Sequence, residues 1–208
     1  MNFGKYTLVF CNGDPPRRER LARLIPAPSR IVCADGGAQK AKSVGYTPDL
    51  IVGDLDSLEG RDTLPASTEI IAVPNQDNTD FEKTLDLMLA RGMDNFLVTA
   101  FAGGRIDQTL ANIQIAFEYS RKCTIALVDD GFLLFPVTGT MEERLASGTT
   151  VSMLSMTDES VVTTDGLAYE LKGTSVPKGG HGISNRSVKE VVRVHVHTGG
   201  ILLMIKDV

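Results

Sequence analysis

The sequence predicts two domains: an α/β domain with a Rossmann-like, mostly parallel sheet and helices on both faces, then a small all-β sandwich. Up to about residue 131, short apolar runs alternate with helical patterns. Beyond that point the helical signal disappears, and short strand-like runs alternate with turn signals. We therefore expect one domain over residues 1–131 and a second over residues 132–208, with the boundary near residues 129–140.

The strands expected in the first domain are nearly continuous apolar runs, as in parallel sheets that are covered on both faces. They span residues 7–11, 31–34, 50–52, 69–73, 96–100 and 124–128. Helical periodicity between them predicts helices at residues 18–24, 38–44, 80–90 and 108–121. In open parallel sheets ligands bind beyond the carboxyl ends of the strands, so a site is expected there.

The strands expected in the second domain span residues 151–156, 160–164, 168–171, 188–197 and 201–205. Turn signals at Asp165-Gly166 and at residues 198–200 predict hairpins between them. Residues 173–187 are rich in Gly and Ser and predict one long loop, and such a loop is typically functional. His195 and His197 fall on the polar face of their strand, which favours a solvated surface over a metal or catalytic site.

Composition narrows the function classes. The net charge is −5 and no basic run is present, which argues against nucleic acid as a partner. No apolar stretch reaches membrane-spanning length and no signal peptide is evident, so we expect no membrane association and a cytoplasmic protein. Cys11, Cys33 and Cys123 lie in or beside apolar runs, which predicts reduced, buried thiols rather than disulfides or a metal cluster.

Six aspartates gather in four short polar motifs, each where a strand should give way to a loop or helix. They are Asp35, Asp54, Asp56, Asp77, Asp80 and Asp107. Mg²⁺ prefers oxygen ligands in near-octahedral geometry, and phosphate groups need backbone N–H groups that glycine-rich turns leave accessible. Carboxylates and such turns at the same edge of a sheet therefore predict a magnesium–nucleotide site and phosphoryl-type chemistry.

The acidic motifs also have simpler interpretations. Asp54 and Asp56 could share or bridge metal ions, or they could be turn acids, with Asp56 capping a short helix at Ser57-Leu58. Thr79 and Glu82 have the spacing of a capping box, which by itself accounts for an acid at Asp80 in the first helical turn. A cap does not require the polar residues 76–78 that precede it.

Two glycine-rich turns could bind phosphate. Asp35-Gly36-Gly37 and Gly103-Gly104-Arg105 each lie between a strand and a helix, and Arg105 adds a fixed positive fork. The alternative is an ordinary strand–helix turn, with Asp107 as the N-cap. Neither a dinucleotide-binding fingerprint nor a Walker A loop occurs in the sequence. In the second domain, Tyr169 is by default a core or surface residue, with a stacking platform for a flat ligand as the functional alternative.

Together these motifs resemble the thiamine pyrophosphokinase family. The resemblance rests on residues 34–38, 48–57, 76–81, 103–108, 164–171 and 182–185, in this order over nearly the whole chain. It implies an α/β domain, a C-terminal β-sandwich and a homodimer. The implied reaction transfers the diphosphoryl group of ATP to the hydroxyethyl oxygen of thiamine, with Mg²⁺ as cofactor, and gives thiamine diphosphate and AMP by in-line attack.

The resemblance also implies roles for individual residues. The catalytic set is Asp54, Asp56, Asp80, Arg105 and Asp107; the metal ligands come from Asp54, Asp56, Asp77 and Asp80. ATP binding falls to Asp35, Gly36, Gly37, Asp77, Thr79, Gly104, Arg105 and Gln108. Tyr169, Ser184 and Asn185 are implied to hold thiamine at the subunit interface, between the α/β domain of one chain and the β-domain of the other.

Three alternatives stay open at this point. A related pyrophosphokinase acting on a hydroxymethylpterin shares part of the aspartate framework. A non-catalytic thiamine- or nucleotide-binding regulator would not need the full set of six aspartates. A flavodoxin- or Rossmann-type cofactor protein is disfavoured because the dinucleotide fingerprint is missing.

Overall fold

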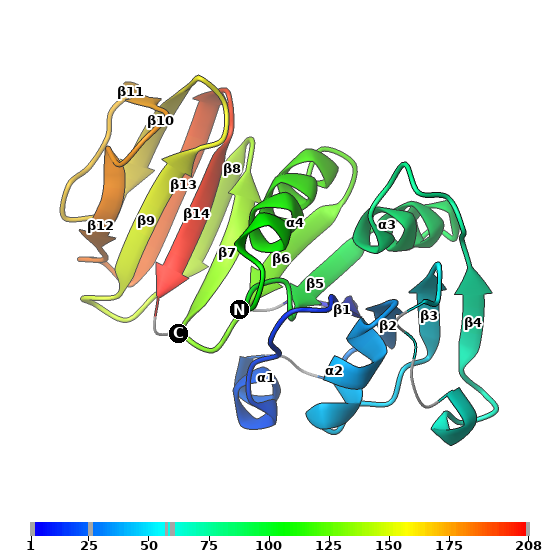
Figure 1. The fold of residues 1–208 in the computed structure, drawn as a ribbon. Coiled ribbons are helices and arrows are strands. Elements are labelled where there is room, and N and C mark those ends of the chain that lie inside the picture. Colours follow the sequence, from blue (N-terminus) through cyan, green and yellow to red (C-terminus); the bar gives the residue numbers. More distant parts are fainter. Residues whose placement is uncertain (1–2, 25–26, 57, 59–60, 207–208) are drawn as a thin grey trace. The chain divides into compact units, whose positions relative to one another are not determined.

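The computed structural model describes residues 3–24, 27–56, 58 and 61–206. The chain divides into two compact units (Figure 1). The first contains the residues up to Ala116 together with Lys122–Asp130, and the second contains Phe117–Arg121 and the residues from Gly131 onward. Each unit is described separately below.

The first unit is built on six parallel strands. They are β1 (Thr7–Phe10), β2 (Arg30–Ala34), β3 (Leu50–Gly53), β4 (Glu69–Ala72), β5 (Asn95–Thr99) and β6 (Thr124–Val128). Their order is β6-β5-β1-β2-β3-β4, and every neighbouring pair is parallel. The chain runs outward from β1 to β4 and then returns to the other side of β1 with β5. The switch point, where ligands bind in such sheets, therefore lies between β1 and β5.

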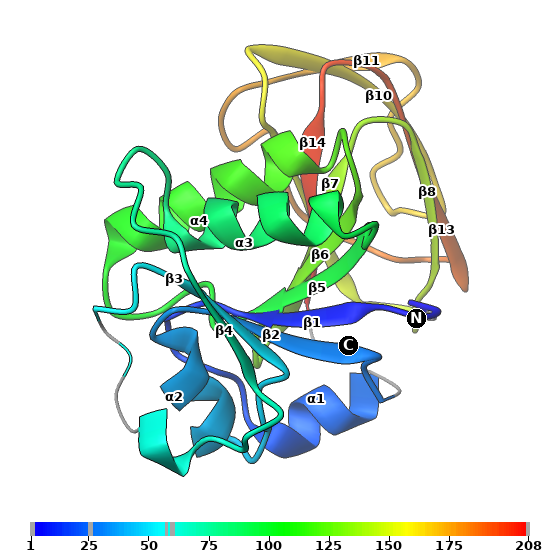
Figure 2. The same cartoon turned by 90° about the vertical axis from the view of Figure 1, so that its right-hand side faces the viewer.

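Helices cover both faces of this sheet, as the sequence predicts. Figure 2 shows α1 (Arg18–Leu24) and α2 (Gly37–Ser43) on one face, and α3 (Asp80–Ala90) and α4 (Ile106–Tyr119) on the other. A short 3₁₀ helix, η1 (Arg61–Thr63), precedes β4. The central strand β1 is fully buried between the helical layers and β5 is buried from Phe96 onward, which explains their apolar sequence.

Helix starts agree with the expected capping chemistry, with one shift. The Thr79 side chain accepts a hydrogen bond from the Glu82 backbone N–H, and the Glu82 carboxylate accepts one from the Thr79 N–H, so the capping box is confirmed. Helix α4 begins two residues earlier than predicted, which puts Asp107 in its first turn rather than at the N-cap. Ser57, part of the alternative cap at Ser57-Leu58, lies outside the described residues.

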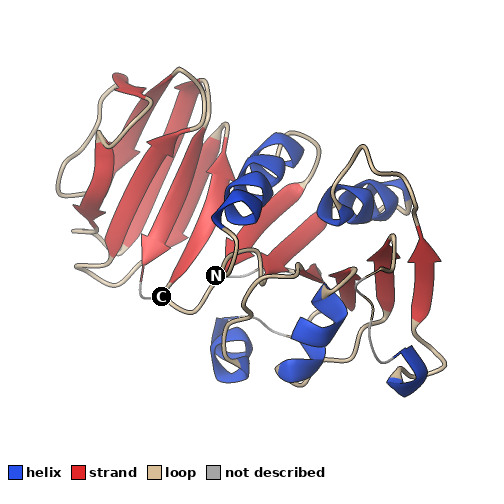
Figure 3. Ribbon diagram, in the orientation of Figure 1, coloured by secondary structure: helices blue, strands red, loops and turns tan. Residues whose placement is uncertain are grey.

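The second unit is a sandwich of two antiparallel sheets, as predicted. Its strands are β7 (Phe132–Val137), β8 (Thr140–Arg144), β9 (Thr150–Ser155), β10 (Glu159–Asp165), β11 (Thr174–Pro177), β12 (Gly182–Arg186), β13 (Val191–Thr198) and β14 (Ile201–Lys206). In one layer the strands pair in the order β12-β9-β14-β7, and in the other they form a separate four-stranded sheet in the order β11-β10-β13-β8. Figure 3 shows the strands of this unit in red. Val192, Val194 and Val196 are buried on one face of β13, while His195 and His197 contact Thr140 and Thr163 on the other, so the polar face is confirmed.

Several local predictions in this unit were wrong. Successive strands mostly pass from one sheet to the other, so the turn at residues 198–200 connects the two sheets instead of closing a hairpin. Among the described strands of this second unit, only β10 and β11 are consecutive and paired. Residues 168–171 form no strand. The expected long loop at 173–187 contains β11 and β12, two short strands with few apolar residues that gain their order from pairing with β10 and β9.

The three cysteines are free, with Cys11 and Cys33 buried and Cys123 half-buried, which confirms reduced thiols. Among the described residues, no helix combines the length and apolar character needed to cross a membrane.

Candidate active site

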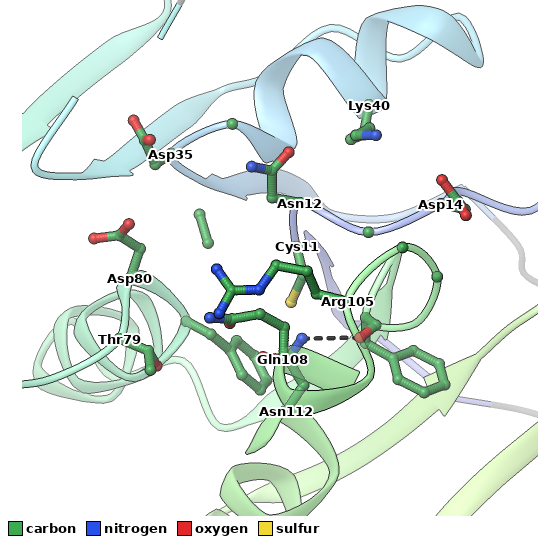
Figure 4. A pocket seen from close by; sticks show the side chains of 17 residues that line it. Cys11, Asn12, Asp14, Asp35, Lys40, Thr79, Asp80, Arg105, Gln108 and Asn112 are labelled. Atoms are coloured by element: carbon green, nitrogen blue, oxygen red, sulfur yellow. Dashed lines mark hydrogen bonds between the residues drawn. The ribbon is translucent and has the colours of Figure 1, made fainter. Parts of the chain in front are cut away.

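A cavity of about 390 Å³ opens at the carboxyl ends of the parallel strands, at the switch point (Figure 4). Its walls come from the segments that follow β1, β2 and β5 and from the first turns of α3 and α4. The lining residues that the sequence predicted are Asp35, Gly36, Thr79, Asp80, Gly104, Arg105 and Gln108. The segments after β1 and β5 are joined where the Gly13 and Asp14 N–H groups donate to the carbonyls of Ala100 and Ala102, both at 2.7 Å.

Carboxylates converge at one end of this region. Oxygen atoms of Asp35, Asp54 and Asp56 lie within 4.8 Å of one another, although the three residues follow two different strands. Asp80 lies near this cluster, because Asp35 and Asp80 both approach Gly53: a Cβ on Gly53 would lie 2.7 Å from the Asp35 Cβ and 3.2 Å from the Asp80 Cγ. A hard divalent cation such as Mg²⁺ fits this all-oxygen donor set.

The backbone is strained where these side chains gather. Asp35, Leu55 and Ala100 have positive φ angles of 37°, 67° and 51°, a region that residues other than glycine rarely adopt. Each follows the carboxyl end of a strand, β2, β3 or β5. Strain of this kind persists only where the surrounding structure imposes it, and it clusters at functional sites.

Hydrogen bonds keep Asp54 ionised. The Gln76 side-chain amide donates to one Asp54 oxygen at 3.1 Å, and the Asp56 backbone N–H donates to the other at 3.3 Å. These donors, the Gln76 amide foremost, lower the pKa of Asp54 below its usual value. Asp54 therefore offers a charged ligand over a wider range of pH than an isolated aspartate.

A buried lysine partly balances the negative charge. The Lys83 side chain is only 5% exposed, and its Nζ lies 2.9 Å from Asp80 Oδ1. Its positive charge also helps to lower the pKa of Asp54, which places Lys83 beside the cluster as a whole. Buried lysines are rare unless they are paired, and Lys83 is paired with Asp80 of the candidate site.

A positively charged side chain, Arg105, and the backbone of Gly104 also line the cavity. Arg105 directly precedes α4 and Gln108 lies in its first turn, and both line the cavity (Figure 4). Arg105 pairs with Asp107, with its Nε 3.1 Å from Asp107 Oδ1, and this ion pair lowers the pKa of Asp107. Gly104 has a φ of +63° and open space where a side chain would be, so its backbone is accessible to an anion.

Five predicted site residues of this unit lie outside the cavity wall: Asp54 and Asp56 of the acidic cluster, and Gly37, Asp77 and Asp107. Asp107 and Asp77 are exposed and are not among the described residues that line it. Gly37 packs against β1, where a Cβ would lie 2.2 Å from the Phe10 carbonyl oxygen. Its lack of a side chain lets α2 begin close to the sheet.

Sequence reasoning missed Asn12, Asp14, Lys40 and Asn112, which all line the cavity. Asn12-Gly13-Asp14 directly follows β1 and has the same polar, glycine-containing form as three of the four motifs, so this signal was present in the sequence. Lys40 lies inside α2 and Asn112 inside α4, where its amide donates to the Phe101 carbonyl at 2.9 Å. Nothing in a helical pattern distinguishes such residues from surface positions.

The three residues expected to bind thiamine lie in the second unit. Tyr169 is 71% exposed, in the segment between β10 and β11. Ser184 lies in β12 with a φ of 61°, and Asn185 follows it with its side chain buried. The Asn185 side-chain amide makes hydrogen bonds with both backbone polar groups of Tyr169.

Known proteins similar to this chain cover nearly all of it. The family model "Thiamin pyrophosphokinase, catalytic domain" matches residues 21–127, and "Thiamin pyrophosphokinase, vitamin B1 binding domain" matches residues 139–201. Thiamine pyrophosphokinase 1 of Oryza sativa subsp. japonica is 31% identical over 91% of the chain and 83% of its own length. Thiamine pyrophosphokinase 2 of Arabidopsis thaliana is 28% identical over 90% of the chain and 81% of its own length.

Solved structures share the fold. The thiamine pyrophosphokinase of Bacillus subtilis superposes with a TM-score of 0.82 at 21% identity, covering 98% of this chain and 99% of that one. The enzyme of Candida albicans also gives a TM-score of 0.82, at 20% identity, over 97% of this chain and 88% of that one.

Proposed function

The chain belongs to the thiamine pyrophosphokinase family, and from this premise we infer that it transfers the diphosphoryl group of ATP to thiamine. The products are thiamine diphosphate and AMP. A bond forms between the hydroxyethyl oxygen of thiamine and the middle phosphorus of ATP, and the bond from that phosphorus to the oxygen bridging it to the α-phosphorus breaks. The observation that carries the assignment of the site is the convergence of Asp35, Asp54, Asp56 and Asp80 beside a cavity with phosphate-binding groups.

The acidic cluster is the proposed magnesium site. Asp54, Asp56 and Asp80 would hold Mg²⁺, and Asp77 would join them from the adjoining loop. When bound, Mg²⁺ neutralises negative charge on the phosphate chain, which phosphoryl-type transfer requires. We propose that one carboxylate of the cluster accepts the proton of the attacking hydroxyl group. Lys83 holds Asp80 in place from the buried side.

The remaining cavity residues are proposed to position ATP. Arg105 and Gln108 bind phosphate oxygens, and the backbones of Gly36 and Gly104 approach them closely. Asp35, Gly37 and Thr79 fix the turns that carry these groups. Asp107 orients the Arg105 guanidinium through their ion pair. In-line displacement depends mostly on such positioning and charge stabilisation, so a covalent nucleophile is not needed.

Thiamine is proposed to bind against Tyr169, with Ser184 and Asn185 beside it, at the interface of a homodimer. The exposed Tyr169 ring supports this because a flat, cationic heterocycle stacks well on an aromatic face. The free thiols agree with the cytoplasm as the proposed compartment. Size-exclusion chromatography with light scattering tests the dimer, which is excluded if the mass stays near 22.4 kDa at micromolar concentration.

Phosphorus NMR of the purified protein with ATP, Mg²⁺ and thiamine tests the reaction. The expected result is equal formation of thiamine diphosphate and AMP. Formation of ADP with thiamine monophosphate would show a simple kinase instead. A parallel incubation with hydroxymethylpterin tests the alternative that the protein is a pterin pyrophosphokinase. Turnover of the pterin but not of thiamine would reverse the substrate assignment.

A further inference from the structure

Tyr169 is an exposed aromatic residue on a firmly anchored segment. Tyr169 is 71% exposed, whereas Leu167, two residues earlier, is 2% exposed and forms an isolated β-bridge with Ser187. The Ala168 N–H donates to the Arg186 carbonyl at 2.9 Å. A large aromatic side chain held out into solvent by ordered neighbours marks a contact surface, since folding alone would favour its burial.

The Asn185 side chain makes hydrogen bonds with the backbone of Tyr169. Its Oδ1 accepts from the Tyr169 N–H at 3.1 Å and from the Arg186 N–H at 2.9 Å, and its Nδ2 donates to the Tyr169 carbonyl at 2.7 Å. An amide oxygen has two lone pairs, so both are used, and one N–H remains on a side chain that is 7% exposed. Asn185 is thus engaged with the chain itself.

The segment that carries Asn185 is also fixed. The Ser184 N–H donates to the Ser152 hydroxyl at 3.0 Å, and the Ser187 hydroxyl donates to the Ala146 carbonyl at 2.5 Å. Asn185 itself pairs with Val151 of β9 in the sheet. The hydrogen bonds of Asn185 therefore connect Tyr169 to the framework of the sandwich.

We propose that Asn185 is a positioning residue, which acts on thiamine through Tyr169 by holding its backbone so that the ring is presented ready for stacking. This inference rests on the proposed thiamine site at Tyr169. A preorganised ring binds a flat ligand without a further loss of conformational freedom, so removing Asn185 should weaken thiamine binding although no contact with thiamine is lost. Without the Asn185 side chain, the Tyr169 N–H and carbonyl both lose their hydrogen-bond partners, and the segment around Tyr169 becomes more mobile.

A double-mutant cycle separates this role from direct contact. The KM for thiamine is measured in Tyr169→Ala, Asn185→Ala and the double variant. We expect each single change to raise the KM for thiamine about tenfold, with little change in the KM for ATP, and the double variant to match Tyr169→Ala within about twofold. His197→Ala, an exposed residue of the same unit with its own side-chain hydrogen bond, is the control and should leave both KM values unchanged.

Additive effects in the double variant would overturn the inference and make Asn185 a direct thiamine ligand. An unchanged KM for thiamine in Tyr169→Ala would remove the proposed thiamine site itself, and the inference with it, so the two failures are distinguishable. If Asn185→Ala does not fold, Asn185→Asp takes its place in the cycle, because its carboxylate keeps the acceptor for the Tyr169 N–H, loses the donor to the Tyr169 carbonyl and repels that carbonyl.

A second measurement needs no turnover. The sequence contains no tryptophan, so Tyr169→Trp introduces a single indole at the platform. The fluorescence anisotropy of that indole should fall when Asn185→Ala or Asn185→Asp is added, because the segment gains nanosecond motion. An unchanged anisotropy would show that Asn185 does not hold the segment, and would overturn the inference.

Discussion

Asp56 is the most exposed of the three carboxylates that meet at the ends of β2 and β3, whereas Asp35 is buried and Asp54 is intermediate. Burial of a carboxylate is costly, so the cluster is tolerated in the fold where solvent or a cation can reach it. Its members therefore differ in what they contribute: the exposed acid serves ligand binding, and the buried acid is also part of the packing.

Asp56→Asn should lower turnover about a hundredfold or more while leaving the thermal midpoint unchanged. The amide keeps the shape of the side chain but removes the negative charge that attracts Mg²⁺. Turnover measured against Mg²⁺ concentration checks this, with Asp62→Asn, an exposed acid in η1, as the control. Normal turnover at low Mg²⁺ in Asp56→Asn would exclude Asp56 as a metal ligand.

Gly53 keeps room for the cluster to form. In Gly53→Ala the new methyl group would lie 2.7 Å from the Asp35 Cβ, so Asp35 or the strand end must shift. We expect a loss of about 1–3 kcal/mol in the free energy of unfolding, typical of overpacking, together with a large loss of turnover. Gly139→Ala, where a methyl group meets open space, is the matched control for urea denaturation and assays. Equal activity in both variants would contradict the role given to Gly53.

Helix α3 connects the acidic site residues to the core of the first unit. Its first residue is Asp80, its buried face carries Phe81, Leu85 and Met88, and its N-terminus is closed by the capping box. The cap fixes the direction in which the helix leaves the loop, and that direction sets where the Asp80 carboxylate points.

Thr79→Ala removes the hydroxyl that accepts the Glu82 N–H, and should cost about 1 kcal/mol in the free energy of unfolding. Glu82→Gln is the comparison, because glutamine can still accept from the Thr79 N–H and keep the box. Chemical denaturation of both variants gives the test. A Glu82→Gln protein as destabilised as Thr79→Ala would show that the charge of Glu82 contributes as much to stability as the Thr79 hydroxyl does.

The elements of the α/β unit could be predicted because burial on both faces leaves a clear pattern. Continuous apolar runs mark its strands, and the acids at strand ends mark the site. Strands β11 and β12 left no such pattern, since only Val176 of β11 is a buried apolar residue and β12 depends on pairing with β9. Lys83 and Lys40 were missed for a related reason: on a helix, a lysine that faces a site has the same sequence signature as one that faces solvent.

In the first unit, the reactivity of the three cysteine thiols depends on how readily the fold opens. Cys33 lies in β2 and Cys11 directly follows β1, and burial raises the pKa of both thiols, so both should react only when the structure around them opens. Cys123 is half-buried just before β6, where burial raises its pKa to about 11. The three thiols are therefore buried to different extents within the same unit.

In the native protein, a disulfide reagent at pH 7 to 9 should label Cys123 first and should leave Cys11 and Cys33 protected. Because only the thiolate reacts, the rate at Cys123 should rise about tenfold per pH unit while the pH stays below its raised pKa. Labelling is followed by absorbance and mass spectrometry, with Cys123→Ser as the control that removes the early phase. Cys11 also lines the cavity, so ATP with Mg²⁺ should slow its labelling further. Fast labelling of Cys11 without nucleotide would mean that the sheet opens at the candidate active site far more readily than its burial implies.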